Sequence, residues 1–72
     1  MDIKYIDDYK YLAAKLKQAR IEAGFGQDDA ARVIDKSQSY ISKIEMGRLR
    51  LDLVQLNELA ELYEKSLDYF LK

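Results

Sequence analysis

Apolar side chains recur every three or four positions along most of this chain, the spacing that places them on one face of an α-helix. The first such stripe consists of Tyr9, Leu12, Leu16, Ala19 and Ala23. Asp7 or Asp8 can cap the start of the helix, and Gly24 can end it. The pattern therefore predicts a long first helix that buries one face.

Residues 27–47 have the pattern of two short helices joined by a tight turn. The inward positions are Ala30, Ala31 and Ile34 in the first helix and Ile41, Ile44 and Glu45 in the second. Gly26 allows a sharp turn before the first helix, and Ser37 is a good N-cap for the second. Asp35 tolerates a left-handed conformation in the turn, and Gly47 suits the position just past the second helix.

Two further helices are expected in the C-terminal part. Asp52 and Gln55 form a variant capping box at the start of the first of them. Its inward stripe consists of Leu53, Leu56, Leu59, Ala60 and Tyr63. Ser66 can cap a last short helix over residues 67–72. The whole pattern predicts an all-α, compact five-helix domain.

Length and composition narrow the possible functions. The 72 residues suit a single domain over residues 1–72, with residues 1–8 as a possible N-terminal arm. The sequence has no Cys and no His, which removes disulfides, Cys/His metal sites and thiol or imidazole catalysis. Carboxylate pairs such as Asp28 and Asp29 lack a pocket-forming scaffold. We therefore expect no enzyme, no cofactor, no metal and no small-molecule ligand.

The N-terminal segment contains acidic residues and no apolar run. It therefore has the pattern of neither a signal peptide nor a membrane span. This favours a cytoplasmic protein with no membrane partner.

Charge is unevenly distributed along the chain. The formal net charge of −1 argues against nucleic acid when taken alone. Residues 32–50, however, hold five basic and two acidic residues, a balance of +3, whereas residues 51–72 hold two basic and five acidic ones, a balance of −3. The basic excess falls on the turn, the second short helix and the loop after it, where a groove-binding helix would meet phosphate. Chance clustering in a highly charged chain is the alternative.

The order of small, apolar and polar residues over roughly 12–71 resembles the helix-turn-helix domain of Cro-type, lambda-repressor-like regulators, the Xre family. The matching residues include Gln27, Ala31, Ile34, Ile41, Ile44 and the ending SYISKIEMG. The resemblance implies a lambda-repressor-like domain with its helix-turn-helix at residues 27–46. It also implies a transcriptional regulator that binds double-stranded DNA as a homodimer on a palindromic operator, with helix 38–46 in the major groove.

The outward side chains of helix 38–46 are short, polar and able to hydrogen-bond. Candidate base contacts are Gln38, Ser39, Ser42 and Lys43. Gln38 can pair bidentately with adenine, and Lys43 can bind guanine or a phosphate. Candidate phosphate contacts are Gln27, Lys36, Tyr40, Arg48 and Arg50. An ordinary solvated helix face is the alternative for any one of these residues.

Arg20 falls on the core side of the first helix, where an unpaired guanidinium would be costly. Its natural partner is Glu45, on the inward face of the second short helix. Members of the resembled family commonly join these two positions by a buried ion pair. A structural ion pair between Arg20 and Glu45 is therefore expected.

The C-terminal end carries more apolar surface than one terminal helical turn can bury. Candidate dimer contacts are Val54, Leu62, Tyr69, Phe70 and Leu71, because related regulators often dimerise through this part. Closure of the core by Leu67 and Phe70 is the alternative. Tyr9 is expected at the edge of the core, and Tyr5 and Ile3 in an arm packed on the domain; the alternative is that they make a second contribution to a dimer surface.

Several positions depart from the family pattern. Gly26 stands where Ser or Thr is usual, Met46 where a basic or polar residue is common, and Leu51 where Pro is frequent. Together with the net charge, these departures support a second hypothesis. In it, the chain is an antitoxin-like or partner-binding module on the same fold, with weak or vestigial DNA binding.

Overall fold

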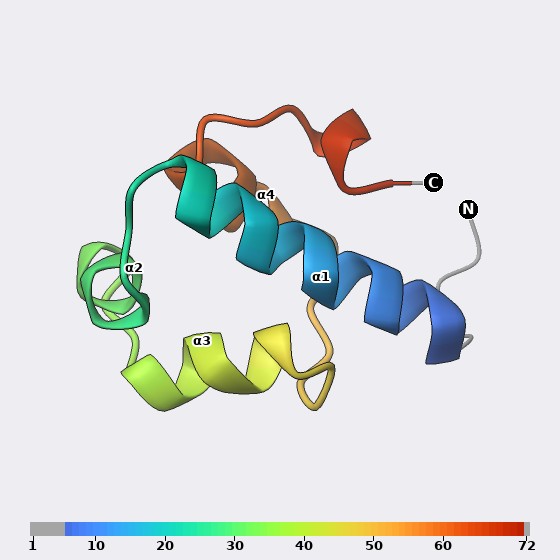
Figure 1. Ribbon diagram of the computed structural model, residues 1–72, viewed down its shortest axis with the longest axis horizontal. Helices are drawn as coiled ribbons and strands as arrows, with labels where there is room; N and C mark the ends of the chain where they lie inside the picture. Colours follow the sequence, from blue (N-terminus) through green and yellow to red (C-terminus); the bar gives the residue numbers. More distant parts are fainter. Residues whose placement is uncertain (1–5, 72) are drawn as a thin grey trace.

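The computed structural model describes residues 6–71, with side chains from residue 9 onward (Figure 1). The α-helices are α1 (Ile6–Glu22), α2 (Gln27–Val33), α3 (Gln38–Glu45) and α4 (Leu53–Leu62), and a 3-10 turn, η1, follows at Leu67–Tyr69. The prediction of an all-α domain is confirmed for this part of the chain. The predicted count of five helices is one too high, because the segment after Ser66 makes one 3-10 turn instead of an α-helix.

α1 begins earlier than the sequence indicated. Its first residue is Ile6, so Asp7 and Asp8 lie inside the helix instead of capping it. Residues 6–8 of the expected N-terminal arm are therefore helical. The rest of that arm, residues 1–5, lies outside the described residues.

Local hydrogen bonds fix where the later helices begin. Ser37 Oγ accepts the N–H of Tyr40 at 3.2 Å, which caps α3. At α4, Asp52 Oδ1 accepts the Gln55 N–H at 2.8 Å, and Gln55 Oε1 accepts the Asp52 N–H at 2.9 Å. Between α2 and α3 the chain turns through Asp35, whose φ of 58° is in the left-handed region that Asp tolerates.

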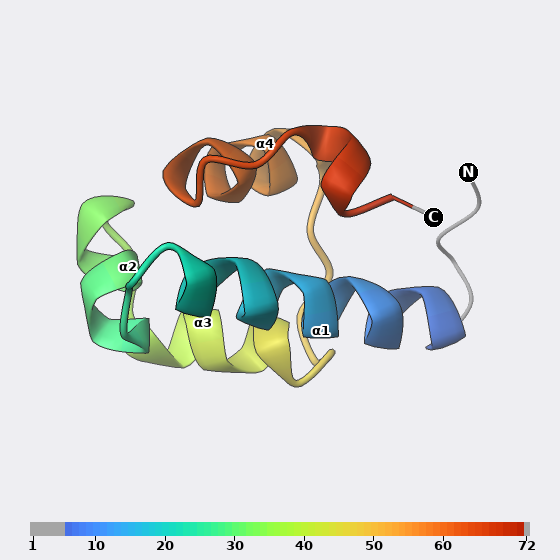
Figure 2. The same ribbon diagram turned by 45° about the horizontal axis from the view of Figure 1, so that its top comes forward.

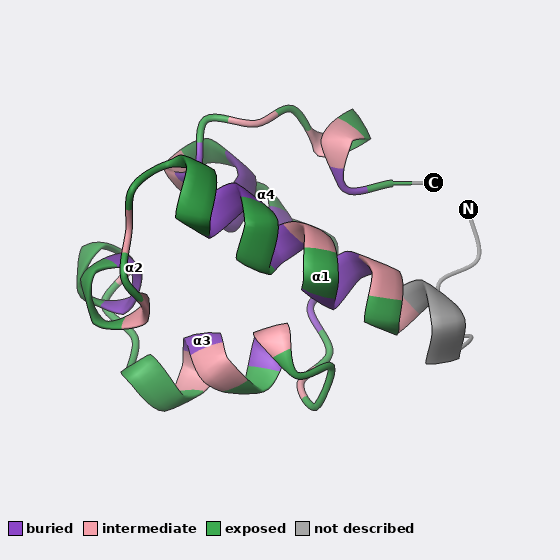
Figure 3. Ribbon diagram, in the orientation of Figure 1, coloured by how far each residue is buried: buried purple, intermediate pink, exposed green. Residues whose placement is uncertain are grey.

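The core lies between α1 and the helices on either side of it. α1 runs the length of the molecule, with α3 and α4 on different sides of it (Figures 1 and 2), and the buried faces of the helices turn inward (Figure 3). The largest fully buried side chains are Leu16, Ile41, Leu59 and Phe70. They come from α1, α3, α4 and the residue after η1, so the C-terminal segment completes the core.

Two residues of the expected inward stripes are exposed. Leu53 is the first residue of α4 and is 66% exposed. Ala23 follows the last residue of α1 and is also exposed. Both stripes were extended one position too far, because a helix end need not face the core even where the apolar spacing continues.

The burial of Phe70 predicts a large effect of its truncation. Phe70→Ala should lower the free energy of unfolding by about 3 to 5 kcal/mol, because it leaves a cavity in the core. Leu71→Ala, at the neighbouring and partly exposed position, is the matched control and should cost far less. Urea denaturation followed by circular dichroism measures both variants. Equal losses would contradict a core role for Phe70.

Candidate nucleic-acid interface

α2 and α3 pack against each other and form the helix-turn-helix unit. Its buried side chains are Ala30 and Ala31 from α2 and Ile41 and Ile44 from α3. The Lys36 N–H closes the turn by donating to the Ala31 carbonyl oxygen at 2.8 Å. One face of α3 is thereby held against the core, and the opposite face remains in solvent.

The solvent face of α3 carries three of the four candidate base contacts. Gln38, Ser39 and Lys43 are exposed, and Met46 at the end of the helix is exposed as well. Ser42 is half-buried at the edge of this face. A partner lying along α3 would therefore meet Gln38, Ser39 and Lys43 directly and Ser42 in part.

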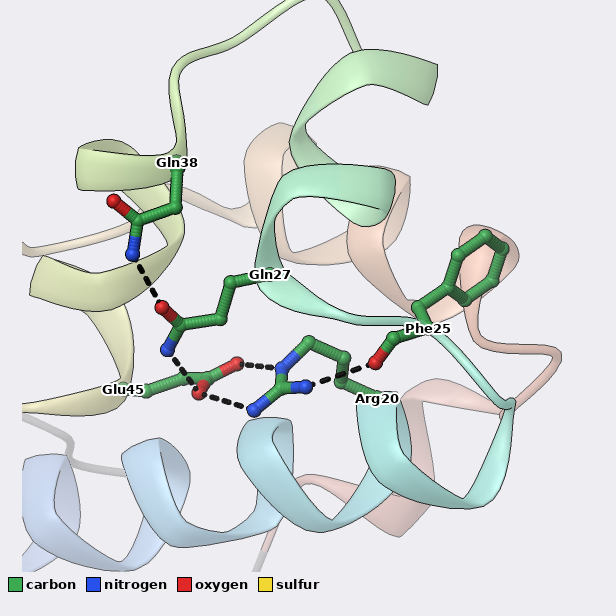
Figure 4. Close-up of polar contacts among 5 residues, drawn as sticks. All are labelled: Arg20, Phe25, Gln27, Gln38 and Glu45. Atoms are coloured by element: carbon green, nitrogen blue, oxygen red, sulfur yellow. Dashed lines mark hydrogen bonds and ion pairs between the residues drawn. The ribbon is translucent and has the colours of Figure 1, made fainter.

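Arg20 and Glu45 form an ion pair inside the domain (Figure 4). Arg20 Nε donates to Glu45 Oε2 at 2.7 Å, and Arg20 Nη2 donates to Oε1 at 3.1 Å. The remaining terminal nitrogen, Nη1, donates to the Phe25 carbonyl oxygen at 2.8 Å. The two side chains are only 10% and 5% exposed. Such a bidentate pair joins α1 to the end of α3 with little freedom of orientation.

The pKa values of Arg20 and Tyr63 favour the ion pair between Arg20 and Glu45. Hydrogen bonding to Glu45 raises the pKa of Arg20 above its ordinary value. Burial, reinforced by the charge of Glu45, raises the pKa of Tyr63 to about 12. Tyr63 is therefore neutral at physiological pH and adds no third charge to the pair.

Two glutamines extend the ion pair to the surface of α3 (Figure 4). Gln27 Nε2 donates to Glu45 Oε1 at 3.0 Å, and Gln38 Nε2 donates to Gln27 Oε1. The chain of contacts thus runs from Arg20 in α1 through Glu45 and Gln27 to Gln38, the first residue of α3. Because each amide is held by a neighbour, the orientation of Gln38 is linked to the buried pair.

The candidate phosphate contacts fall into two groups. Lys36, Arg48 and Arg50 are exposed in the turn before α3 and the loop after it. Gln27 is half-buried and already bonded to Glu45 and Gln38, which leaves one hydrogen on its Nε2 for a phosphate.

The expectation that Tyr40 contacts phosphate needs correction. Its hydroxyl is buried and has no hydrogen-bond partner among the described residues, while Lys36 Nζ lies 5.4 Å from the centre of its ring. Burial, together with the negative charges of Glu58 and Asp52, raises its pKa. The hydroxyl therefore faces the domain, because the Tyr40 side chain packs against the hydrophobic core.

The candidate dimer contacts also differ in how much of each side chain is exposed. Val54 is 79% exposed and Leu71 is 37% exposed, whereas Leu62 and Tyr69 are half-buried. Phe70 is fully buried and offers no surface to a second copy, so its placement in a dimer interface is wrong. The alternative, that Phe70 closes the core, agrees with its burial.

The sequence did not reveal two contacts of the interface. The pairing of Gln27 with Gln38 depends on the crossing of α2 and α3, for which two isolated glutamines give no signal. The second is the ring of Tyr9 in α1, whose centre lies 5.3 Å from the guanidinium carbon of Arg50. The Tyr-rich N-terminal segment was a visible signal, but it did not point to Arg50.

The unit consists of two packed helices joined by a tight turn. One helix has an exposed polar face with cations on either side of it, and this arrangement is that of a DNA-binding helix-turn-helix domain. A family model described as helix-turn-helix matches residues 16–70. The chain belongs to the Xre-type, lambda-repressor-like helix-turn-helix family, and the resemblance read from the sequence is confirmed. Members are DNA-binding regulators and are not typically enzymes. No curated protein matches the chain.

The described part of the chain has neither a metal-binding cluster nor a membrane-spanning helix. No group of three or more acidic, His or Cys side chains is placed to hold a metal ion within residues 9–71, where side chains are described. None of the helices within residues 6–71 has the length and apolar character needed to cross a bilayer.

The buried position of the ion pair predicts a strong effect of removing one partner. Glu45→Ala should lower the free energy of unfolding by about 3 to 5 kcal/mol, because Arg20 is left as an uncompensated buried charge. The double variant Arg20→Met/Glu45→Leu should lose much less than the sum of the two single variants. Thermal and urea melts measure both.

The matched control is Glu22→Ala. Glu22 also forms a 2.7 Å ion pair, with Lys65, but it does so at the surface, where water screens the charges. Its loss should be much smaller. A loss under about 1 kcal/mol for Glu45→Ala, in the range of surface pairs, would contradict a structural role for the pair.

Proposed function

We propose that this chain is a sequence-specific transcriptional regulator that binds a palindromic operator as a homodimer, with α3 in the major groove. The observation that carries the proposal is the state of Gln38. This residue is exposed at the start of α3, and one of its two Nε2 hydrogens is used in the bond to Gln27. The second Nε2 hydrogen and Oε1 remain available to a base.

An amide with one available donor and one available acceptor matches adenine. The major-groove edge of adenine offers N7 as acceptor and the N6 amino group as donor, so Gln38 can pair with it bidentately. Lys43, on the same exposed face, can donate to guanine O6 and N7 or to a phosphate. Ser39 and Ser42 are short enough to bond base edges or phosphates without keeping the helix out of the groove.

Phosphate contacts would hold α3 in register on the duplex. Lys36, Arg48 and Arg50 supply exposed cations around α3, and Gln27 retains one amide hydrogen. Such contacts are independent of sequence and release counterions, so affinity should fall steeply with salt. Binding to an operator also implies a cytoplasmic protein.

A homodimer accounts for the apolar side chains left exposed near α4. Val54, its neighbour Leu53 and Leu71 are exposed and would form the main part of this surface, and Leu62 and Tyr69 would contribute partly buried area. A two-fold axis there would place the two α3 helices about one helical turn of DNA apart, which requires a palindromic site.

A protein-binding module is the second candidate. Two observations favour it: the acidic balance of residues 51–72 and the exposed apolar pair Leu53 and Val54. In this case the partner would be a protein with a basic, apolar surface. The apolar part of such an interface is not screened by salt, so its binding would respond less to salt than DNA binding does.

Selection of bound sequences from a random duplex library at moderate salt tests DNA recognition. We expect a palindromic motif, and we expect Gln38→Ala/Lys43→Ala to abolish its enrichment, because each good base contact contributes roughly 1 to 3 kcal/mol of discrimination. The control is Lys17→Ala/Gln18→Ala, which removes the same residue types from an exposed face of α1. Absence of enrichment with folded protein would favour the protein-binding module.

Sedimentation velocity tests the dimer surface. Val54→Glu should shift the protein toward monomer and weaken binding to a full palindrome more than to a half-site. Ile21→Glu, a similar change at an exposed apolar position of α1, is the control and should leave the oligomeric state unchanged. A wild-type protein that is monomeric both free and on DNA would overturn the homodimer.

A further inference from the structure

Arg50 lies on an aromatic ring from a distant part of the chain. Its guanidinium carbon is 5.3 Å from the ring centre of Tyr9, within the range of a cation–π contact. Tyr9 is half-buried in α1, while Arg50 is exposed in the loop after α3. The contact therefore ties the beginning of α1 to the loop that follows the groove-facing helix.

The loop is anchored on both sides of Arg50. Leu49 packs against the hydrophobic core and Leu51 is itself buried. The backbone on either side is thus held in place, and the long Arg50 side chain is the part left to be ordered. Tyr9 provides the surface on which it is ordered.

A guanidinium held over a ring keeps its hydrogen-bonding capacity. The ring attracts the positive charge of the guanidinium, and the contact uses none of the five N–H donors as a conventional hydrogen bond, so they remain available to another acceptor. Those donors are the ones that bind phosphate oxygens bidentately. Holding the side chain before binding also reduces the conformational entropy that a flexible arginine loses on contact.

We propose that Tyr9 is a positioning residue for DNA binding, which holds the Arg50 guanidinium ready to clamp a backbone phosphate beside α3. The proposal rests on the proposed binding of DNA by α3. It also assigns a function to part of the Tyr-rich N-terminal segment. Arg48, in the same loop, has no ring or carboxylate partner among the described residues and provides an internal comparison.

Binding to a short fluorescent duplex of arbitrary sequence at low salt provides the test, because phosphate contacts do not depend on sequence. Tyr9→Leu should weaken binding roughly two- to five-fold, and Tyr9→Phe, which keeps the ring face, should bind like the wild type. The effect of Tyr9→Leu should disappear in an Arg50→Ala background. It should persist in an Arg48→Ala background. Thermal melts establish that each variant is folded at the assay temperature.

The salt dependence gives a second readout that a loss of stability would not change. Arg50→Ala should reduce the slope of log K against log salt by roughly 0.9, the value for one phosphate contact. The proposal is overturned if Arg50→Ala binds like the wild type, or if Tyr9→Leu weakens binding equally with and without Arg50. If the wild type binds no duplex, the proposed function itself fails and this proposal fails with it.

Discussion

The structure depends on one electrostatic constraint: a guanidinium and a carboxylate that are both out of water must satisfy each other. Arg20 comes from α1 and Glu45 from the end of α3, so the pair fixes the separation of these two helices. The same guanidinium holds the carbonyl of Phe25, and therefore the loop that leads into α2. The Arg20–Glu45 pair thus sets the relative positions of α1, α3 and the loop before α2. A change in the geometry of the pair would displace the exposed face of α3.

Local chemistry made much of the fold predictable. Ser37, Asp52 with Gln55, and Asp35 each act within a few residues of their own position, so their roles as caps and turn residues could be read without knowledge of the tertiary structure. The inward positions of α3 were readable for the same reason, because helical periodicity fixes which side chains share a face. The ion pair between Arg20 and Glu45 could not be predicted from local chemistry alone. Its prediction also used the cost of an unpaired buried charge and the family resemblance.

The features that could not be predicted depend on how the helices pack against one another. Tyr40 lies on the flank of α3, and its hydroxyl is buried because the side chain packs against the core, which helical periodicity does not show. Phe70 could have closed the core or faced a second copy, and the path of the chain through η1 decides between them. The link from Gln27 to Gln38 likewise follows from the crossing of two helices. Apolar spacing also placed Ala23 and Leu53 on buried faces, although Ala23 lies just past the end of α1 and Leu53 is the exposed first residue of α4. Periodicity does not show which residues at a helix end still face the core.

Because α3 and α4 lie on different sides of α1, the basic and the acidic segments of the chain are separated in space (Figure 2). The +3 balance of residues 32–50 includes α3, and the −3 balance of residues 51–72 includes α4. A molecule with a net charge of −1 gains no long-range attraction to a polyanion, but this separation gives it an electric dipole. The field of a duplex would exert a torque on this dipole, and that torque favours the orientation in the proposed complex, with α3 toward the phosphates and α4 away. For the proposed binding through α3, the acidic segment would therefore help to orient the protein during its approach to DNA and would disfavour encounters through α4.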